Sequence, residues 1–171
     1  ASNDTSGKLK VKGEGAEPAS LQVGNDGGAV YYPGESPAGN AVNPDGSVTP
    51  RSYGSMTYAL LKTYTLCGLG GDDPRVKAAV AWITEHWTVA ENPGADAKLG
   101  EKARYQGLFY YYMVMAQALN AAKVDQVQTQ QDGRLMTVDW RKALREKLES
   151  LQKPDGSWRN DKNERWMEGQ D

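Results

Sequence analysis

The chain has 171 residues, with 20 lysines and arginines against 22 aspartates and glutamates, and a formal net charge of −2. Because phosphate contacts need clustered cations, this even balance without long runs of one sign argues against nucleic-acid binding. No stretch of about 18 apolar residues is present, so no membrane span is expected and the chain is predicted to be soluble.

The first fifty residues differ in composition from the rest of the chain. They hold most of the prolines and show no sustained apolar period, which predicts an irregular polar arm and loop over 1–50. Within this arm a short strand is expected near Leu9 to Lys12. Turns are expected at 25–28 and 43–46, where Asn, Asp, Pro and Gly cluster.

Residues 51–171 are predicted to form an α-helical segment. Apolar and small side chains recur at helical spacing after Tyr53 until glycines follow, and they predict a buried stripe of Met56, Ala59, Leu60, Thr63 and Cys67. A second helix is expected to begin with Asp73 as its N-cap and Pro74 in its first turn. Its predicted stripe comprises Val76, Ala79, Val80, Ile83 and Trp87.

A third helix is expected from about Gly107 to Ala122 and is apolar nearly all round, which predicts burial from both sides. The Asp132-Gly133 pair between alternating segments predicts a small β-hairpin insertion near 124–138. Asp139 then caps a fourth helix, whose predicted stripe comprises Trp140, Leu144, Leu148 and Leu151.

The four helices alternate in character, which suggests a repeat. The first and third are rich in Tyr, Met and Ala, whereas the second and fourth are more polar. Aligning Gly54 with Gly107 gives an offset of 107 − 54 = 53, and aligning Asp73 with Asp139 gives 139 − 73 = 66. The difference, 13 residues, is accounted for by the predicted hairpin.

The segment Gln152–Trp158 reads QKPDGSW and resembles the Q-x-x-x-G-x-W repeat signature of squalene and oxidosqualene cyclases and of prenyltransferase β subunits. Residues 54–61 are similar to the opening of an inner helix in those repeats. With Asp26–Gly28 and 31–36 ahead of them, the arrangement resembles bacterial prenyltransferase/squalene-oxidase-type repeat proteins, a terpenoid cyclase-like class. The resemblance covers residues 25–168.

The resemblance implies an all-α fold, an α/α toroid present as a partial arc of helical hairpins, with the irregular arm and the hairpin added to it. In the signature, the Gln152 amide is expected to satisfy backbone groups at a helix end, Gly156 to permit a tight turn, and Trp158 to pack over Gln152. These three residues are interpreted as a structural staple. The first copy departs from the pattern, because His86 stands where Gln152 stands.

Inner helices of such toroids line a cavity for isoprenoid chains, so the resemblance makes the aromatic residues of the first and third helices ligand-binding candidates. The alternative is that they fill the core between helix layers. The candidates are Tyr58, Tyr64, Phe109, Tyr110, Tyr111 and Tyr112.

No catalytic residue, metal site or cofactor is predicted. The cyclase acid motif Asp-x-Asp-Asp is not matched by Asp72-Asp73, and Thr65 stands where an Asp-x-Cys zinc element ending at Cys67 needs its aspartate. A single cysteine also excludes an internal disulfide. His86 and Cys67 are interpreted as structural, with Cys67 buried on a helix face.

Three functions follow as alternatives. The first is a non-catalytic repeat domain that binds a partner chain or a hydrophobic, isoprenoid-like ligand. The second is a fragment of a terpene cyclase or prenyltransferase whose catalytic residues lie elsewhere, and the third is a structural piece of an exported assembly. Four helices do not close a ring, so the missing toroid helices are expected from another segment, another chain or a self-associated copy.

Overall fold

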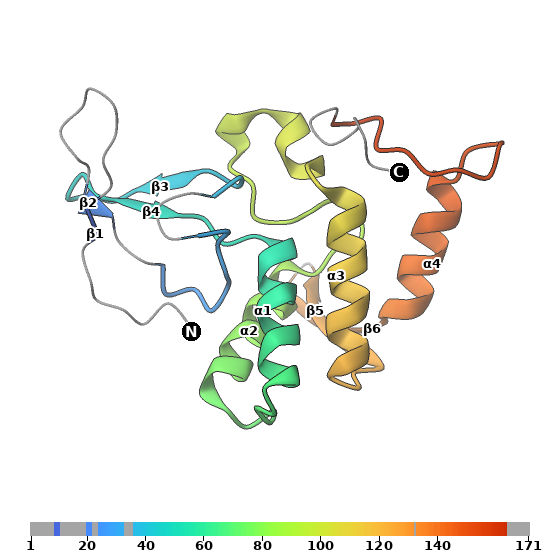
Figure 1. The fold of residues 1–171 in the computed structure, drawn as a ribbon, viewed down its shortest axis with the longest axis horizontal. Helices are drawn as coiled ribbons and strands as arrows, with labels where there is room; N and C mark the ends of the chain where they lie inside the picture. The colour runs from blue at the N-terminus through green and yellow to red at the C-terminus, as the bar shows by residue number, and fades with distance from the viewer. Residues whose placement is uncertain (1–8, 11–19, 22–23, 33–35, 132, 164–171) are drawn as a thin grey trace.

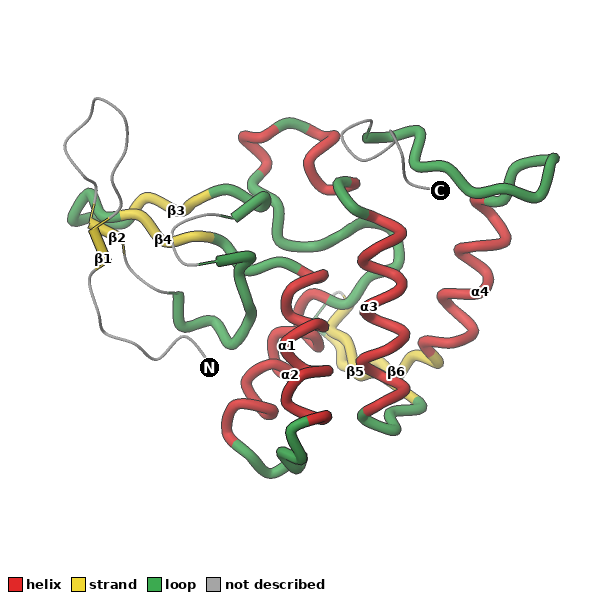
Figure 2. Tube along the Cα trace, in the orientation of Figure 1, coloured by secondary structure: helices red, strands yellow, loops and turns green. Residues whose placement is uncertain are grey.

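The computed structural model describes residues 9–10, 20–21, 24–32, 36–131 and 133–163 (Figures 1 and 2). The helices are α1 (Gly54–Leu66), α2 (Pro74–His86), α3 (Leu108–Ala121) and α4 (Trp140–Leu151). Two 3-10 helices, Ala97–Leu99 and Glu101–Tyr105, lie between α2 and α3. The strands are β1 (Leu9–Lys10), β2 (Ser20–Leu21), β3 (Asn40–Val42), β4 (Val48–Pro50), β5 (Gln126–Gln131) and β6 (Arg134–Asp139).

The helices α1 and α3 pack side by side, as expected for 54–68 and 107–122, and α2 packs against α1 (Figure 1). In Figure 1 the pair stands in front of α2 and of the antiparallel β5–β6 hairpin, whose strand β5 packs on α2. The buried core joins all four helices and β5. Its largest members include Tyr58, Leu61, Trp82, Tyr111, Met115, Leu119 and Trp140.

The prediction of an all-α toroid is wrong, because the described chain is a mixed α/β structure. Near the N-terminus the strands form a sheet in the order β1-β2-β4-β3, in which β2 and β4 run parallel and the other neighbours antiparallel. The expected arm is therefore partly ordered as sheet, and β1 confirms the described part of the strand predicted near Leu9.

The β3–β4 hairpin was missed because its stability comes from polar contacts, which give no apolar period. Asn43 Nδ2 donates to the hydroxyls of Ser47 and Thr49, both at 2.9 Å, and Asp45 accepts the Ser47 N–H at 3.0 Å. Gly46, with φ of 78°, bonds back to the Asn43 carbonyl at 2.9 Å. The predicted turn at 43–46 is confirmed, as the closing turn of a hairpin.

The buried faces of α1 and α3 differ from the predicted ones. In α1 the predicted stripe lies on the more open side, and the buried side is made by Ser55, Thr57, Tyr58, Leu61 and Tyr64. The helix α3 is not buried all round, since Tyr110 and Met113 are exposed. Both α1 and α3 therefore keep large hydrophobic residues open to solvent, among them Leu66 in α1 and Tyr110 and Met113 in α3.

The predicted helix starts at Asp73 and Asp139 are confirmed. Asp73 accepts the Arg75 N–H at 2.9 Å, and Asp139 accepts the Lys142 N–H at 3.0 Å. These bonds satisfy backbone donors that the first turn of a helix leaves unpaired. The hairpin expected near 124–138 is also present, as β5 and β6.

The start of α1 is capped from a distant loop. Its N-cap residue, Tyr53, makes no side-chain cap, but Asn92 Oδ1 accepts the Ser55 N–H at 3.1 Å. Asn92 Nδ2 donates to the Ser55 hydroxyl at 3.0 Å and to the Gln106 carbonyl at 3.1 Å. The buried Asn92 thus ties the start of α1 to the segment that leads into α3.

Candidate functional site

The structure divides the six aromatic candidates into buried and open residues. Four of them, Tyr58, Tyr64, Tyr111 and Tyr112, are members of the buried core, and Phe109 is partly buried against it. Tyr110 is the one of the six that is open to solvent, with 47% of its surface exposed. The structure therefore leaves Tyr110 as the member that a ligand or partner can reach.

The buried tyrosines of α3 have hydroxyls engaged in structural hydrogen bonds. Tyr111 donates to the Thr88 carbonyl and Tyr112 to the Val89 carbonyl, both at 2.7 Å, so the two rings fasten the loop after α2 to α3. Burial raises the pKa of both phenols, which keeps them neutral donors at any ordinary pH.

Tyr58 faces Tyr111 across the α1–α3 contact, with the ring centroids 5.8 Å apart. Its hydroxyl is buried and makes no hydrogen bond to the described residues. Burial, and then the neighbouring Tyr111, raises the pKa of this phenol far above its usual value. Tyr58 therefore stabilises the core through the packing of its ring, and its hydroxyl adds no hydrogen bond among the described residues.

An exposed aromatic surface lies where the N-terminal loop meets the first turns of α1 and α3. We call it the tyrosine face; its residues are Tyr31, Tyr32, Tyr53, Tyr110 and Met113. Tyr31 is 63% exposed, Tyr32 45% and Met113 47%, whereas Tyr53 is 8% exposed. Tyr110 and Met113 stand three residues apart on one side of α3.

One backbone contact and the proximity of three phenols relate the tyrosines of this face to one another. Tyr53 N–H donates to the Ala29 carbonyl at 3.1 Å, which places the chain at Tyr31 beside the start of α1. Burial, followed by the nearby phenols of Tyr110 and Tyr31, raises the pKa of Tyr53 to about 12. Tyr31 and Tyr32 pack edge to face at 5.6 Å.

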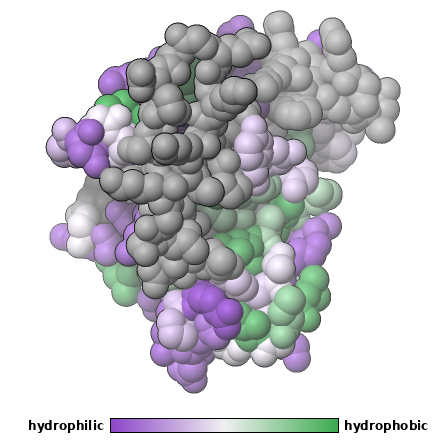
Figure 3. Space-filling model, turned by 60° about the vertical axis from the view of Figure 1, so that its left-hand side comes forward, coloured by the Kyte–Doolittle hydropathy of each residue, from purple (hydrophilic) through white to green (hydrophobic). Residues whose placement is uncertain are grey.

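The hydropathy view shows an apolar area that the tyrosines do not produce, because the Kyte–Doolittle scale ranks tyrosine as slightly hydrophilic. In Figure 3 apolar residues gather on the right-hand side below the grey segments, with hydrophilic residues around them. Tyrosine and methionine are the residue types enriched in the centres of protein recognition surfaces, because they give large contact areas at low conformational cost. The tyrosine face thus has the composition of a binding surface.

At the end of α4, Gln152 and Trp158 act differently from their expected roles, whereas Gly156 permits the tight turn as expected. Gln152 Nε2 donates to the Gly156 carbonyl at 2.9 Å, so the amide closes the turn after the helix. The helix end is capped instead by Trp158, whose Nε1 donates to the Leu148 carbonyl at 2.8 Å. Gly156 has φ of 86°, the left-handed conformation that favours glycine.

A cavity of about 410 Å³ between the N-terminal segments and α2 is lined in part by His86, Ser52 and Asp26. Ser52 donates to the Asp26 carboxylate at 2.8 Å, and the Nδ1 of His86 lies 2.9 Å from the Trp82 carbonyl. Since a carbonyl only accepts, Nδ1 carries the proton there. Ser52 bonds to the carboxylate and His86 to the backbone, so a Ser-His-Asp relay is not assembled.

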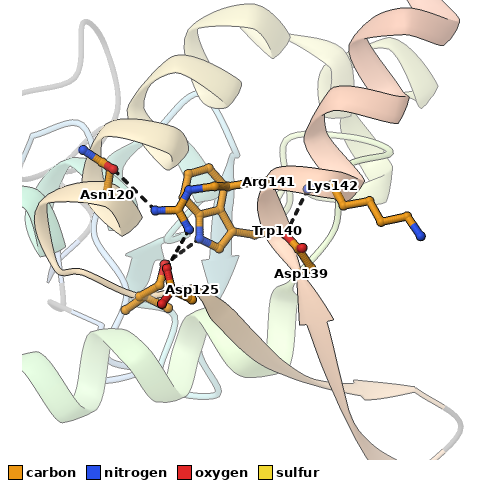
Figure 4. Close-up of polar contacts among 7 residues, drawn as sticks. Asn120, Asp125, Asp139, Trp140, Arg141 and Lys142 are labelled. Carbon is orange, nitrogen blue, oxygen red and sulfur yellow. Dashed lines mark hydrogen bonds and ion pairs between the residues drawn. The ribbon is translucent and has the colours of Figure 1, made fainter.

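An open depression of about 770 Å³ lies at the start of α4, lined in part by Asp125, Asp139, Arg141 and Lys142. Figure 4 shows that Arg141 reaches back across Trp140 to Asp125 and Asn120, at 2.9 and 3.4 Å. Trp140 Nε1 donates to the Val124 carbonyl at 2.7 Å. These contacts join the end of α3 to the start of α4 and leave Arg141 occupied.

Other predicted positions have simple outcomes. Cys67 is exposed at the end of α1, so the expectation of a buried thiol is wrong. Within the part of the chain that the structure describes, no three metal-ligating side chains come together. No described helix has the length and apolar character needed to cross a bilayer.

Sequence reasoning did not identify Tyr31, Tyr32 and Tyr53 as site residues. It also did not identify Asn92 as the residue that links the start of α1 to the segment before α3. The adjacent Tyr31-Tyr32 pair between turn signals is the one sequence feature that marks an exposed aromatic loop. The polar anchor Asn92 gives no such signal, because its partners lie 14 and 37 residues away.

Comparisons with known proteins assign this chain to no family. No family model matches it, and neither does any curated protein or any solved structure. The resemblance of Gln152–Trp158 to the repeat signature therefore stays a prediction.

Proposed function

We propose that this chain is a non-catalytic binding module whose tyrosine face recognises an apolar surface of another protein. The observation that carries the proposal is the exposure of Tyr31, Tyr32, Tyr110 and Met113, with the phenols of Tyr31 and Tyr110 near the buried Tyr53. Aromatic residues in such a position are the usual energetic centres of protein interfaces. The second and third alternatives, an enzyme fragment and a structural piece of an assembly, gain no support from these residues.

A protein partner fits the geometry better than an isoprenoid chain does. Small hydrophobic ligands bind in concave pockets that bury most of their surface. The depression of about 770 Å³ is lined by polar and charged residues, and the cavity of about 410 Å³ has a mixed lining; neither lining includes any of the six aromatic candidates. The tyrosine face is instead an open surface, which matches a protein partner.

A photo-crosslinking amino acid placed at Met113 tests the proposal, with the same group at Arg145 on α4 as the matched control. In an extract of the source cells, a single protein adduct is expected at position 113, and Tyr110→Ala introduced into the same chain should diminish it. Adducts of equal yield at both positions, or none at position 113, contradict the proposal.

A parallel titration with farnesyl and squalene analogues separates the two kinds of partner. The proposal predicts no saturable binding by the parent chain. Saturable binding that is lost in Tyr110→Ala would show that the tyrosine face binds a hydrophobic ligand and would contradict the proposed protein partner.

A further inference from the structure

The hairpin β5–β6 has an open strand edge, at a distance along the chain from the tyrosine face. In the described residues its sheet has two strands, so β6 has a neighbour on one side only. Five of the six β6 residues are exposed, including Leu135 at 61% and Met136 at 45%. Long exposed edges with apolar side chains are templates for pairing with another strand.

The hairpin register tells which backbone groups of β6 are free. Gln131 pairs with Arg134 across a two-residue connection, and such a closing pair exchanges its backbone hydrogen bonds. Because the pattern alternates along an antiparallel pair, Arg134, Met136 and Val138 bond to β5. The N–H and C=O groups of Leu135 and Thr137 then point away from β5, toward the open side.

We propose that β6 pairs with β6 of a second copy, in an antiparallel arrangement about a two-fold axis through Met136. This register sets Met136 opposite the partner's Met136 and Leu135 opposite the partner's Thr137. It gives every free backbone group of Leu135 and Thr137 a hydrogen-bond partner in the second copy. A two-fold axis perpendicular to the sheet requires one residue to lie opposite its own copy, and in this register that residue is Met136.

The charges of the strand permit this pairing, and its side chains gain from it. Arg134 and Asp139 are the charged residues of β6 and lie at its two ends, so the central residues 135–138 bring no like charges together. Edge strands that must stay unpaired commonly carry a lysine or an inward-pointing charge near their centre, and residues 135–138 of β6 carry none. The formal net charge of −2 also gives little repulsion between copies.

The face that carries Met136 continues the molecular core. Met136 pairs with Thr129, and Val138 with Val127, and both β5 residues are buried on the side toward α2. Joining two Met136 side chains across the axis would extend this apolar layer from one copy into the next.

Sedimentation velocity over a range of concentrations tests the proposal on the full chain. The parent is expected to show a reversible monomer–dimer equilibrium. Met136→Lys, which sets two lysines opposite each other, should raise the dissociation constant at least about tenfold. Gln128→Lys is the matched control on the same hairpin, exposed and away from the β6 edge, and should dimerise like the parent.

Disulfide trapping tests the register independently of any loss of folding. In a Cys67→Ala background, Met136→Cys should form a cross-linked dimer under mild oxidation. In the proposed register the two residues at position 136 form a non-hydrogen-bonded pair, and the Cβ atoms of such a pair are about 5 Å apart. Gln128→Cys should not form a cross-linked dimer. Three results would overturn the proposal. The parent could stay monomeric at about several hundred micromolar, the dimer could be unaffected by Met136→Lys, or disulfide trapping could be equal at positions 128 and 136.

Discussion

Tyr58 and Tyr111 pack against each other across the α1–α3 contact, with ring centroids 5.8 Å apart, yet their hydroxyls have different environments. Tyr111 donates to the Thr88 carbonyl, whereas the buried Tyr58 hydroxyl makes no hydrogen bond to the described residues. Both rings thus stabilise the contact by packing, but only the Tyr111 hydroxyl adds a hydrogen bond to the stability of the fold.

Removal of the two hydroxyls is expected to have unequal effects. Tyr111→Phe should lower the free energy of unfolding by about 1 kcal/mol, because a hydrogen bond is lost, while Tyr58→Phe should leave it unchanged or raise it. Urea unfolding followed by circular dichroism measures both. A larger loss for Tyr58→Phe than for Tyr111→Phe would show that the Tyr58 hydroxyl is bonded in solution.

Asn92 is expected to be the most sensitive polar residue of the helical part. Asn92→Ala removes the acceptor for the Ser55 N–H and the donor to the Gln106 carbonyl, and should lower the free energy of unfolding by about 2 kcal/mol or more. Asn120→Ala, an exposed residue with one long bond to Arg141, is the control and should change it by less than about 0.5 kcal/mol. Similar losses in the two variants would contradict the role of Asn92.

Gly68 and Lys123 occupy the same position after α1 and α3. Each donates its N–H three residues back, to Thr65 and Asn120, and each has a positive φ, 77° and 53°. Glycine adopts this conformation freely and lysine does not. Lys123→Gly should therefore raise the midpoint of thermal unfolding, and Gly68→Ala should lower the free energy of unfolding by about 1 kcal/mol. Calorimetry checks both, and shifts of the same sign would contradict the shared geometry.

Asp73 is expected to make stability depend on pH in the acid range. Hydrogen bonds from the side chain and backbone of Arg75 lower the pKa of Asp73 from 3.8 to about 2. Because the folded pKa is the lower one, this carboxylate stabilises the fold above the unfolded pKa, and the contribution is lost as pH falls from about 4 to about 2.

Asp73→Asn isolates this contribution, since asparagine also caps helices. Unfolding measured from pH 7 down to pH 2 should show a difference between parent and variant that shrinks as pH falls through that window. A difference that is constant with pH would contradict the assigned cause.

The local helix chemistry was predictable from sequence, and the packing between elements was not. Asp73 and Asp139 mark helix starts because the bonds that cap a helix are made within three residues of the cap. Periodicity predicts the wrong buried side for α1, because apolar residues lie on both sides of this helix and the sequence alone does not say which side meets α3. The prediction of an all-α fold is wrong because the strands of the N-terminal sheet are two or three residues long, too short for an apolar period, and because the pairing of β2 with β4 joins segments distant in sequence.

The candidate site was predictable only in part for the same reason. The sequence predicts that the six aromatic residues either line a cavity or fill the core. Consecutive residues of α3 point to different sides, so Tyr111 and Tyr112 enter the core while Tyr110 faces solvent. Tyr31 and Tyr53 join Tyr110 through the bond between Tyr53 and Ala29, a contact that no spacing along the chain reveals.

Recognition of a protein through the tyrosine face is tested most directly by the affinity for the partner identified by cross-linking. Titration calorimetry should compare the parent with Tyr110→Ala and with Arg145→Ala, an exposed residue on α4. A loss of affinity of about tenfold or more for Tyr110→Ala, with Arg145→Ala unchanged, is the predicted result. Equal affinity of the parent and Tyr110→Ala would contradict it.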